Sequence, residues 1–245
     1  MRNGDFMKKF YLAKMYKAFT LAEILVVILI IGIVAALTLP QLADVSTDKE
    51  TVSKVQKNYA AITDAFGRAE ANYGPITEWF SGMDQDIPGA SQKFGERLLE
   101  YMKVSQVCGQ ESGCIADAPL LNPPGEFLIP SFLGYLQSTG AYMAKLADGT
   151  SIAFRFEGQV CRIGIDVDGP TTGENQQGVD VFEFSIGLDS GSNVYRYREV
   201  LPSAGGLNWT GNRVSEYATA WVIMNGNLDY LNCGGLNWET KISCK

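Results

Sequence analysis

Residues 19–39 read FTLAEILVVILIIGIVAALTL, and this stretch decides how the chain begins its fold. It holds 21 residues with a single charged one, Glu23, and no side chain from Ile24 to Leu37 is polar. At about 1.5 Å of rise per residue, a helix of this length spans roughly 32 Å, which is close to the hydrocarbon thickness of a bilayer. The stretch predicts a transmembrane helical segment over 19–40, with Pro40 as a kink.

The charges that precede this apolar run are mostly positive. Residues 1–18 hold five basic residues and one acidic residue, a net charge of +4, and the remaining chain holds 15 basic and 26 acidic residues, a net charge of -11. Basic flanks stay in the cytoplasm by the positive-inside rule. The asymmetry predicts a cytoplasmic N-terminus and an exported, acidic C-terminal region.

Three interpretations of the run compete. A cleaved secretory signal has a shorter apolar stretch, and neither it nor a plain signal anchor has a use for Glu23. A carboxylate inside a membrane costs about 2.5–3.5 kcal/mol on insertion scales and therefore normally has a partner. Since the run contains no cation, the third interpretation places that partner on another chain.

The stretch KAFTLAEILVVILIIGIVAALTLP, residues 17–40, resembles the N-terminus of type IV prepilins and of the pseudopilins of type II secretion. In that family a basic leader ends before a Phe, an acid is the fifth mature residue and a Pro often is the twenty-second. Counting from Phe19, Glu23 is fifth and Pro40 is twenty-second. The sequence departs from the family at Ala18, where Gly is usual.

The resemblance implies a prepilin whose leader, residues 1–18, is removed between Ala18 and Phe19 by a prepilin peptidase that also N-methylates Phe19. It implies that Glu23 meets the N-terminal ammonium of a neighbouring pilin or pseudopilin subunit, a pairing that makes a buried carboxylate tolerable. It further implies an assembly platform protein and a cytoplasmic assembly ATPase as partners. The location implied is the inner membrane, single-pass, and then a periplasmic or extracellular filament.

Residues 41–74 continue the helix with a different pattern. Apolar residues recur at steps of three and four, which is typical of one face of an amphipathic helix, and Gly74-Pro75 ends it. The stripe consists of Val52, Val55, Tyr59, Ile62, Phe66, Ala69 and Tyr73. We expect a sheet to pack on it, giving an α+β, pilin-like fold: a long N-terminal helix on a C-terminal antiparallel sheet.

The rest of the chain divides into a connecting αβ region, 75–150, and a sheet and tail region, 151–245. In the first, Ser91 is expected to cap a short helix that reaches about Lys103. In the second, apolar and polar residues alternate over short segments separated by turn-length gaps, which favours antiparallel strands. The expected strands are TSIAFRFE (150–157), VCRIGID (160–166), DVFEFSI (180–186), NVYRYREV (193–200) and ATAWVIM (218–224).

Five cysteines fall in the region expected to be exported, where disulfides persist. Cys108 with Cys114 and Cys233 with Cys244 are close enough in sequence for local bonds, which leaves Cys161 free. The resemblance adds that tail disulfides are common in pilins. Five cysteines with one free allow 15 connectivities, and a structural zinc cluster is a further alternative, although paired C-x-x-C motifs are lacking.

An acidic loop, DVDGPTTGENQQGVDVFEF, joins two of the expected strands. Asp166, Asp168 and Asp180, with Asn175 and carbonyl oxygens, offer the hard ligands that calcium takes, but the spacing is not that of an EF-hand. The resemblance adds that major pseudopilins bind calcium in a related loop. The other interpretation is ordinary turn formation by Asp and Gly.

Composition excludes several functions. The chain has no histidine, which removes Ser-His-Asp and Cys-His catalysis and His-ligated metals, and its net charge of -7 argues against nucleic acid as a partner. Trp209, Trp221, Tyr230 and Trp238 either form a binding face or pack locally. We expect a structural, non-enzymatic subunit of a pilus or pseudopilus; the alternative is a signal-anchored exported domain, an adhesin or a calcium- or glycan-binding module, that does not polymerise.

Overall fold

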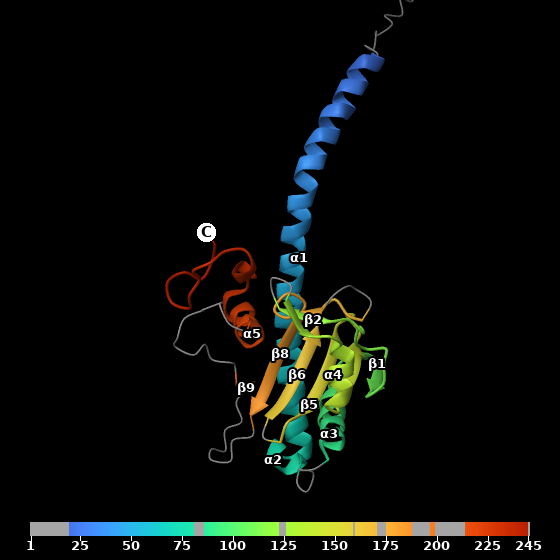
Figure 1. Cartoon of the computed structure of the whole chain (residues 1–245), viewed down its shortest axis with the longest axis vertical. Helices are drawn as coiled ribbons and strands as arrows, with labels where there is room; N and C mark the ends of the chain where they lie inside the picture. Colours follow the sequence, from blue (N-terminus) through green and yellow to red (C-terminus); the bar gives the residue numbers. More distant parts are fainter. Residues whose placement is uncertain are drawn as a thin grey trace, which may run out of the picture. The chain divides into compact units, whose positions relative to one another are not determined.

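A computed structural model describes residues 20–80, 86–122, 126–158, 160–170, 175–187, 197–198 and 214–244 (Figure 1). The chain forms two compact units, Met1–Ser46 and Thr47–Lys245.

Helix α1, Leu21–Tyr73, runs through both units. Its C-terminal end is where the sequence predicts it, because Gly74 has a φ of 79°, a conformation that favours glycine, and Pro75 follows. The helix continues through Pro40, but the side chains of residues 37–46 are not described, so the kink at Pro40 stays a prediction.

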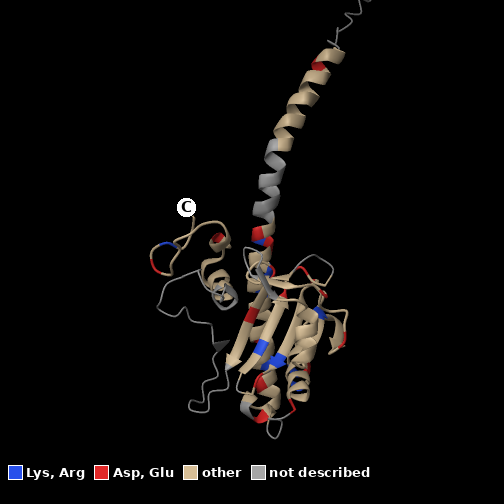
Figure 2. Ribbon diagram, viewed as in Figure 1, with Lys and Arg blue, Asp and Glu red and all other residues tan. Residues whose placement is uncertain are grey.

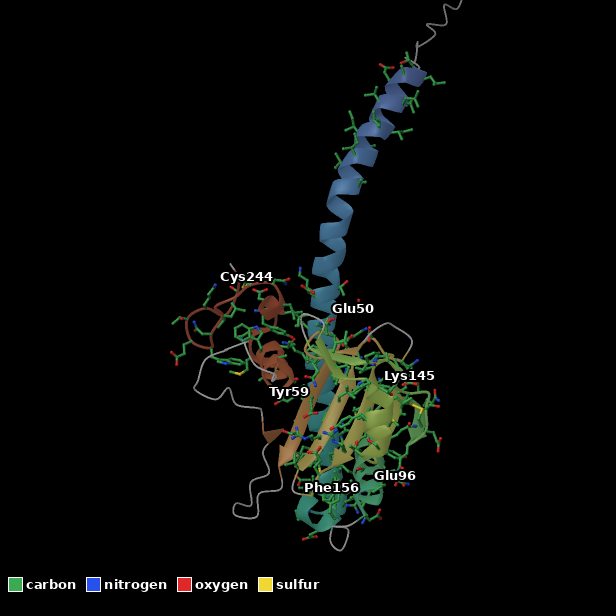
Figure 3. All side chains as sticks on the ribbon, in the orientation of Figure 1. Glu50, Tyr59, Glu96, Lys145, Phe156 and Cys244 are labelled. Carbon is green, nitrogen blue, oxygen red and sulfur yellow. A yellow bond between two sulfur atoms is a disulfide. The ribbon has the colours of Figure 1, made fainter. Side chains whose placement is uncertain are left out.

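In the second unit, the apolar stripe of α1 is the face that packs. Val55, Ile62 and Ala69 are fully buried, and the Tyr59 ring, which Figure 3 labels, stacks on Phe184 of the sheet with centroids 5.9 Å apart. Tyr73, the last residue of the stripe, is 37% exposed. The predicted amphipathic half is therefore confirmed, with its end at the rim of the core.

The sheet that receives this stripe has six strands, all antiparallel, in the order β1-β4-β5-β6-β8-β9 (Figure 1). Their bounds are β1 Val104–Gly109, β4 Tyr142–Leu146, β5 Ser151–Phe156, β6 Val160–Asp166, β8 Val181–Gly187 and β9 Tyr197–Arg198. The α+β fold with a helix on an antiparallel sheet is confirmed. Two of the strands, β1 and β4, come from the region that the sequence assigned to connections. Of the strand expected over 193–200, only residues 197–198 lie within the described residues.

Two short helices complete the layer on the α1 side of the sheet. Helix α2, Ile76–Trp79, follows Pro75, and α3, Ile87–Leu99, packs Phe94 edge-on against Phe154 of β5 at 5.6 Å. The expected cap at Ser91 is wrong: Asp86 caps α3 by accepting the Gly89 N–H, so the helix starts five residues earlier than predicted. Ser91 lies inside the helix, where its hydroxyl donates to the Ile87 carbonyl.

The strand expected over 218–224 is also wrong, because these residues form part of helix α5, Val214–Asn225. Its Ala218, Trp221 and Val222 are fully buried. An apolar run without periodicity fits a buried helix and a buried strand equally well, which is why the pattern misled. The tail continues through the 3-10 helix η1, Asp229–Leu231.

The opposite face of the sheet carries a second, smaller core. It is formed by α4, Phe132–Ser138, and a three-stranded sheet in the order β3-β2-β7, with β2 Leu120–Asn122, β3 Glu126–Ile129 and β7 Asn175–Gln176. Phe132, Leu133 and Leu136 of α4 pack there with Ala153 of β5 and Val181 of β8. The main sheet thus has apolar layers on both faces.

Candidate functional site

The described part of α1 begins with a reciprocal hydrogen-bonded cap. Thr20 Oγ accepts the Glu23 N–H at 3.2 Å, while Glu23 Oε2 accepts the Thr20 N–H at 2.7 Å and the Thr20 hydroxyl at 2.8 Å. This is a capping box, in which an N-terminal Thr and a Glu three residues later satisfy the free donors of the first turn. It fixes the first helical residue at Leu21.

The capping box holds the Glu23 carboxylate in a defined position, which the sequence alone did not predict. The predicted cleavage residues, Ala18 and Phe19, lie outside the described residues, but Thr20 immediately follows them and holds the Glu23 carboxylate. Sequence reasoning missed Thr20, although T-x-x-E before an apolar run is a recognised signal for a helix start.

The Glu23 carboxylate faces no cation in the described part of the chain. Its neighbours along the helix are all apolar, and their side chains are largely exposed: Leu21 by 79%, Leu29 by 63% and Ile31 by 61%. Figure 2 shows this segment without a basic residue among those it describes. Exposed apolar surface on this scale marks a site of contact with lipid or protein.

Among the residues that the structure describes, no helix is sufficiently long and apolar to cross a membrane.

The three aspartates of the acidic loop come together at one end of the sheet. Asp166 is 1% exposed; its Oδ1 accepts the N–H groups of Asp168 and Gly169 at 3.3 and 3.1 Å, while its Oδ2 has no hydrogen-bond partner. Asp180 Oδ1 accepts the Gln176 N–H at 2.5 Å. Burial raises the pKa of Asp166, and the neighbouring carboxyls of Asp168 and Asp180 raise it further.

Burial also raises the pKa of Asp180 to about 7, with the charge of Asp168 acting in the same direction. Among the described residues, no group of three His, Cys, Asp or Glu side chains is placed to hold a metal ion. A cation at this end of the sheet would therefore take some of its oxygen ligands from backbone carbonyls or water. Asn175 is buried, and its Nδ2 has no hydrogen-bond partner.

The structure forms disulfides between Cys108 and Cys114 and between Cys233 and Cys244, the two local pairs expected from the sequence. Cys161 is free, lies on β6 and is buried, and burial raises the pKa of its thiol. Such a thiol is inert. The second bond fixes the tail, and the Cys244 N–H donates to Asp229 Oδ2 at 2.7 Å.

The aromatic residues near the C-terminus pack locally. Trp221 and Tyr230 are buried, and the Trp238 ring lies 5.0 Å from that of Trp221. Trp209 lies outside the described residues. Of the two interpretations offered by the sequence, local packing describes these three side chains.

Comparison with known proteins identifies the N-terminal segment. Residues 13–39 match the family described as the prokaryotic N-terminal methylation motif. No curated protein and no solved structure matches the chain. The matched segment contains Ala18, Phe19 and the Thr20–Glu23 capping box, and so the chain carries the prepilin-type signal of type IV pilins and pseudopilins.

Proposed function

We propose that the chain is a structural subunit of a type IV pilus or of a type II secretion pseudopilus, made as a prepilin and assembled through its apolar helix. The observation that carries the proposal is the methylation motif over residues 13–39, within which α1 begins at Leu21. The bond between Ala18 and Phe19 thus precedes the helix, so that a peptidase can cut it without unwinding α1.

After cleavage, Phe19 carries a new amine one residue before Thr20. A neighbouring subunit then supplies the cation that Glu23 lacks, and the ion pair offsets the cost of placing a carboxylate in an apolar environment. The exposed apolar side chains of residues 21–36 enter the inner membrane first and pack against other subunits in the filament afterwards. The second unit stays on the export side.

This function requires a prepilin peptidase that also methylates, an assembly platform protein and a cytoplasmic assembly ATPase. The mature chain moves from a single-pass position in the inner membrane into a periplasmic or extracellular filament. The competing proposal is an anchored, exported binding domain that keeps its leader and does not polymerise.

The mature N-terminus distinguishes the two proposals. The full chain is produced with a prepilin peptidase, and its N-terminal peptide is analysed by mass spectrometry. We expect N-methylated Phe19 as the first residue, with an equal or larger cleaved fraction in Ala18→Gly and no cleavage in the bulky variant Ala18→Leu. An intact leader in the presence of an active peptidase contradicts the filament proposal.

The role of Glu23 is tested by two substitutions that separate its charge from its helix cap. Glu23→Gln keeps an oxygen that accepts the Thr20 N–H, whereas Glu23→Ala removes both the charge and the cap. We expect both variants to be cleaved but to be lost from filaments, measured by the amount of subunit in sheared fibres. Filament incorporation of Glu23→Gln at the unmutated level shows that the charge is dispensable and that the proposed pairing is wrong.

A second candidate function of the exported unit is calcium binding at the acidic loop, where part of the set Asp166, Asp168 and Asp180 holds the ion together with backbone carbonyls or water. Its support is the Oδ2 of Asp166, which is buried without a partner beside two further carboxylates, an arrangement that a divalent cation stabilises. Calcium, when bound, would offset the negative charge of these carboxylates. The side chains themselves hold the loop through the backbone bonds that Asp166 and Asp180 accept.

Calcium binding is tested by melting the full chain in detergent with calcium and with a chelator. We expect calcium to raise the melting temperature of the unmutated chain and to have no such effect on Asp168→Ala. Asp148→Ala, which changes an aspartate bonded instead to Lys57, is the matched control and should keep the response. A melting temperature that calcium does not change in the unmutated chain refutes the site.

A further inference from the structure

A cavity of about 260 Å³ lies on the face of the main sheet opposite α1. Strands β5, β6 and β8 form its floor, α4 forms one wall, and Leu120 and Ile129 of the small sheet form another. The cavity contains no residue of the capping box, of the disulfides or of the three aspartates. Native interiors rarely hold voids larger than a water molecule, so an accessible hollow of this size between packed layers is a candidate binding site.

The floor of the cavity is flat because two neighbouring strands carry minimal side chains there. Ala153 of β5 pairs directly with Gly164 of β6, and a Cβ placed on Gly164 would meet no atom within 4 Å. Glycine in a strand interior weakens the strand and often marks the close approach of another group. Above this floor stand Phe132 and Leu136 of α4, so the space suits a planar apolar group.

Three charged side chains line the cavity, Arg155, Arg162 and Glu183, and both arginines also pair with Glu157, which is not part of the lining. Arg162 Nε contacts Glu157 Oε2 at 2.6 Å, its Nη1 contacts Glu183 Oε1 at 2.5 Å, and Arg155 Nη2 contacts Glu157 Oε1 at 2.7 Å. Figure 2 shows basic residues on two adjacent strands and an acidic one on the strand beside them. Two guanidinium groups thus meet two carboxylates, so each of these charges already has a partner before a ligand binds.

Two neutral polar groups remain for a ligand, beside the Nε of Arg155, which is buried without a hydrogen-bond partner. The Tyr135 hydroxyl accepts a hydrogen bond from Arg155 Nη1 at 2.5 Å, which leaves its own proton to donate. The Gln177 side chain also lines the cavity and makes no hydrogen bond within the described part of the chain. Both groups match a ligand that carries a single hydrogen-bonding atom.

We propose that this cavity binds one neutral aromatic group that bears one hydrogen-bonding atom, a phenol or an indole. The size agrees, because a cavity of about 150 Å³ accepts benzene and a larger one accommodates a ring with a polar substituent. The flat floor over Ala153 and Gly164 takes the ring, and Tyr135 or Gln177 takes the polar atom. The group is either a free small molecule or the tip of a tyrosine or tryptophan side chain of a partner protein.

The test measures the binding of p-cresol and of indole to the full chain in detergent by ligand-observed NMR. Toluene lacks the polar atom, and benzoate and benzylamine carry a charge, so all three should bind more weakly. N-acetyl-tyrosine amide distinguishes the two sources: binding comparable with that of p-cresol identifies a side chain of a partner, and its exclusion identifies a small molecule.

Gly164→Leu fills the cavity and should weaken p-cresol binding about tenfold or more. Gly67→Leu, which places the same side chain on an open face of α1, is the control and should leave binding unchanged. If Gly164→Leu does not fold, Gln177→Leu serves instead, and it should reduce the preference for p-cresol over toluene. The proposal is overturned if neither probe binds, if benzoate or benzylamine binds as tightly, or if the folded Gly164→Leu variant binds p-cresol like the unmutated chain.

Discussion

The two halves of α1 share one secondary structure but differ in what their apolar side chains contact. In residues 47–73, apolar side chains lie on one face, and Val55, Ile62 and Ala65 are fully buried against the sheet. In residues 21–36, they lie all around the helix and are exposed, Leu29 by 63%. Helix formation is therefore common to both halves, whereas burial within the chain is confined to the second. The first half presents apolar side chains to its surroundings on every side.

The largest expected effect tests this division directly. Ile62→Ala removes a fully buried side chain and should lower the free energy of unfolding of the second unit by about 2–5 kcal/mol. Ile28→Ala makes the same chemical change on an exposed side chain and should leave that free energy nearly unchanged. Denaturant unfolding of both full-length variants in the same detergent makes the comparison. Equal losses of stability contradict the division of α1 into two environments.

The next effect concerns the disulfide that fixes the C-terminal tail. The Cys233–Cys244 bond closes a loop over a sequence separation of 11, and its removal in the double variant Cys233→Ser/Cys244→Ser should cost about 3 kcal/mol. Cys161→Ser, which changes a buried free thiol, is the control for loss of a cysteine alone. Differential scanning calorimetry measures both, and the proposed methylation of Phe19 should be unaffected in the double variant because Phe19 is distant in sequence from the tail.

A smaller effect is expected from the aspartates at the end of the sheet. Burial raises the pKa of Asp166 and that of Asp180, the latter to about 7, whereas unfolded aspartates lose their protons near pH 4. The folded chain therefore binds these protons more tightly, so their stabilising contribution is full below about pH 4 and is lost as the pH rises through 7. Without calcium, the melting temperature of Asp180→Asn relative to the unmutated chain should rise between pH 5 and pH 8.

Calcium should oppose this loss, because it competes with protons for the same carboxylates. The calcium-dependent rise in melting temperature should consequently be larger at pH 8 than at pH 5. A rise of equal size at both pH values indicates that calcium binds elsewhere in the chain.

Predictions from the sequence were most reliable for segments that pack on one side only, because burial of a single face produces a regular spacing of apolar residues. The stripe through Val55, Ile62 and Ala69 has helical periodicity because one side of α1 meets the sheet. Strand β5 was predicted as part of the segment 150–157, although its residues are buried on both faces, where α3 covers one face and α4 the other. Strand β4, Tyr142–Leu146, shows little alternation in its burial and was assigned to a connection. The buried helix α5 was mistaken for a strand because its apolar residues leave no polar face to reveal a period.

The candidate sites also differ in how far they can be predicted from the sequence. Glu23 is detectable from sequence because it is a lone charge in an apolar run, and local Cys pairs are detectable because they are close in the chain. The cavity over Gly164 is not, because its walls come from segments that are distant in sequence and meet only after the sheet has formed. Asp166 was named as a ligand, but its buried, unpartnered Oδ2 depends on tertiary packing.

The smallest expected effect concerns the first turn of α1. Thr20→Val removes the hydroxyl that accepts the Glu23 N–H and should cost about 1 kcal/mol of helix stability at that end, whereas Thr20→Ser preserves the capping box. Because the core of the second unit contains no residue of this turn, its melting temperature should not change in either variant. The difference should appear in hydrogen exchange of the amides of residues 21–24, which becomes faster in Thr20→Val alone.

The Val side chain also removes the hydroxyl bond to Glu23 Oε2, so the carboxylate is held less firmly for the neighbouring subunit of the proposed filament. Filament yield should therefore fall while leader cleavage continues. Unchanged exchange in Thr20→Val would mean that surrounding lipid or protein, rather than the capping box, sets the start of the helix.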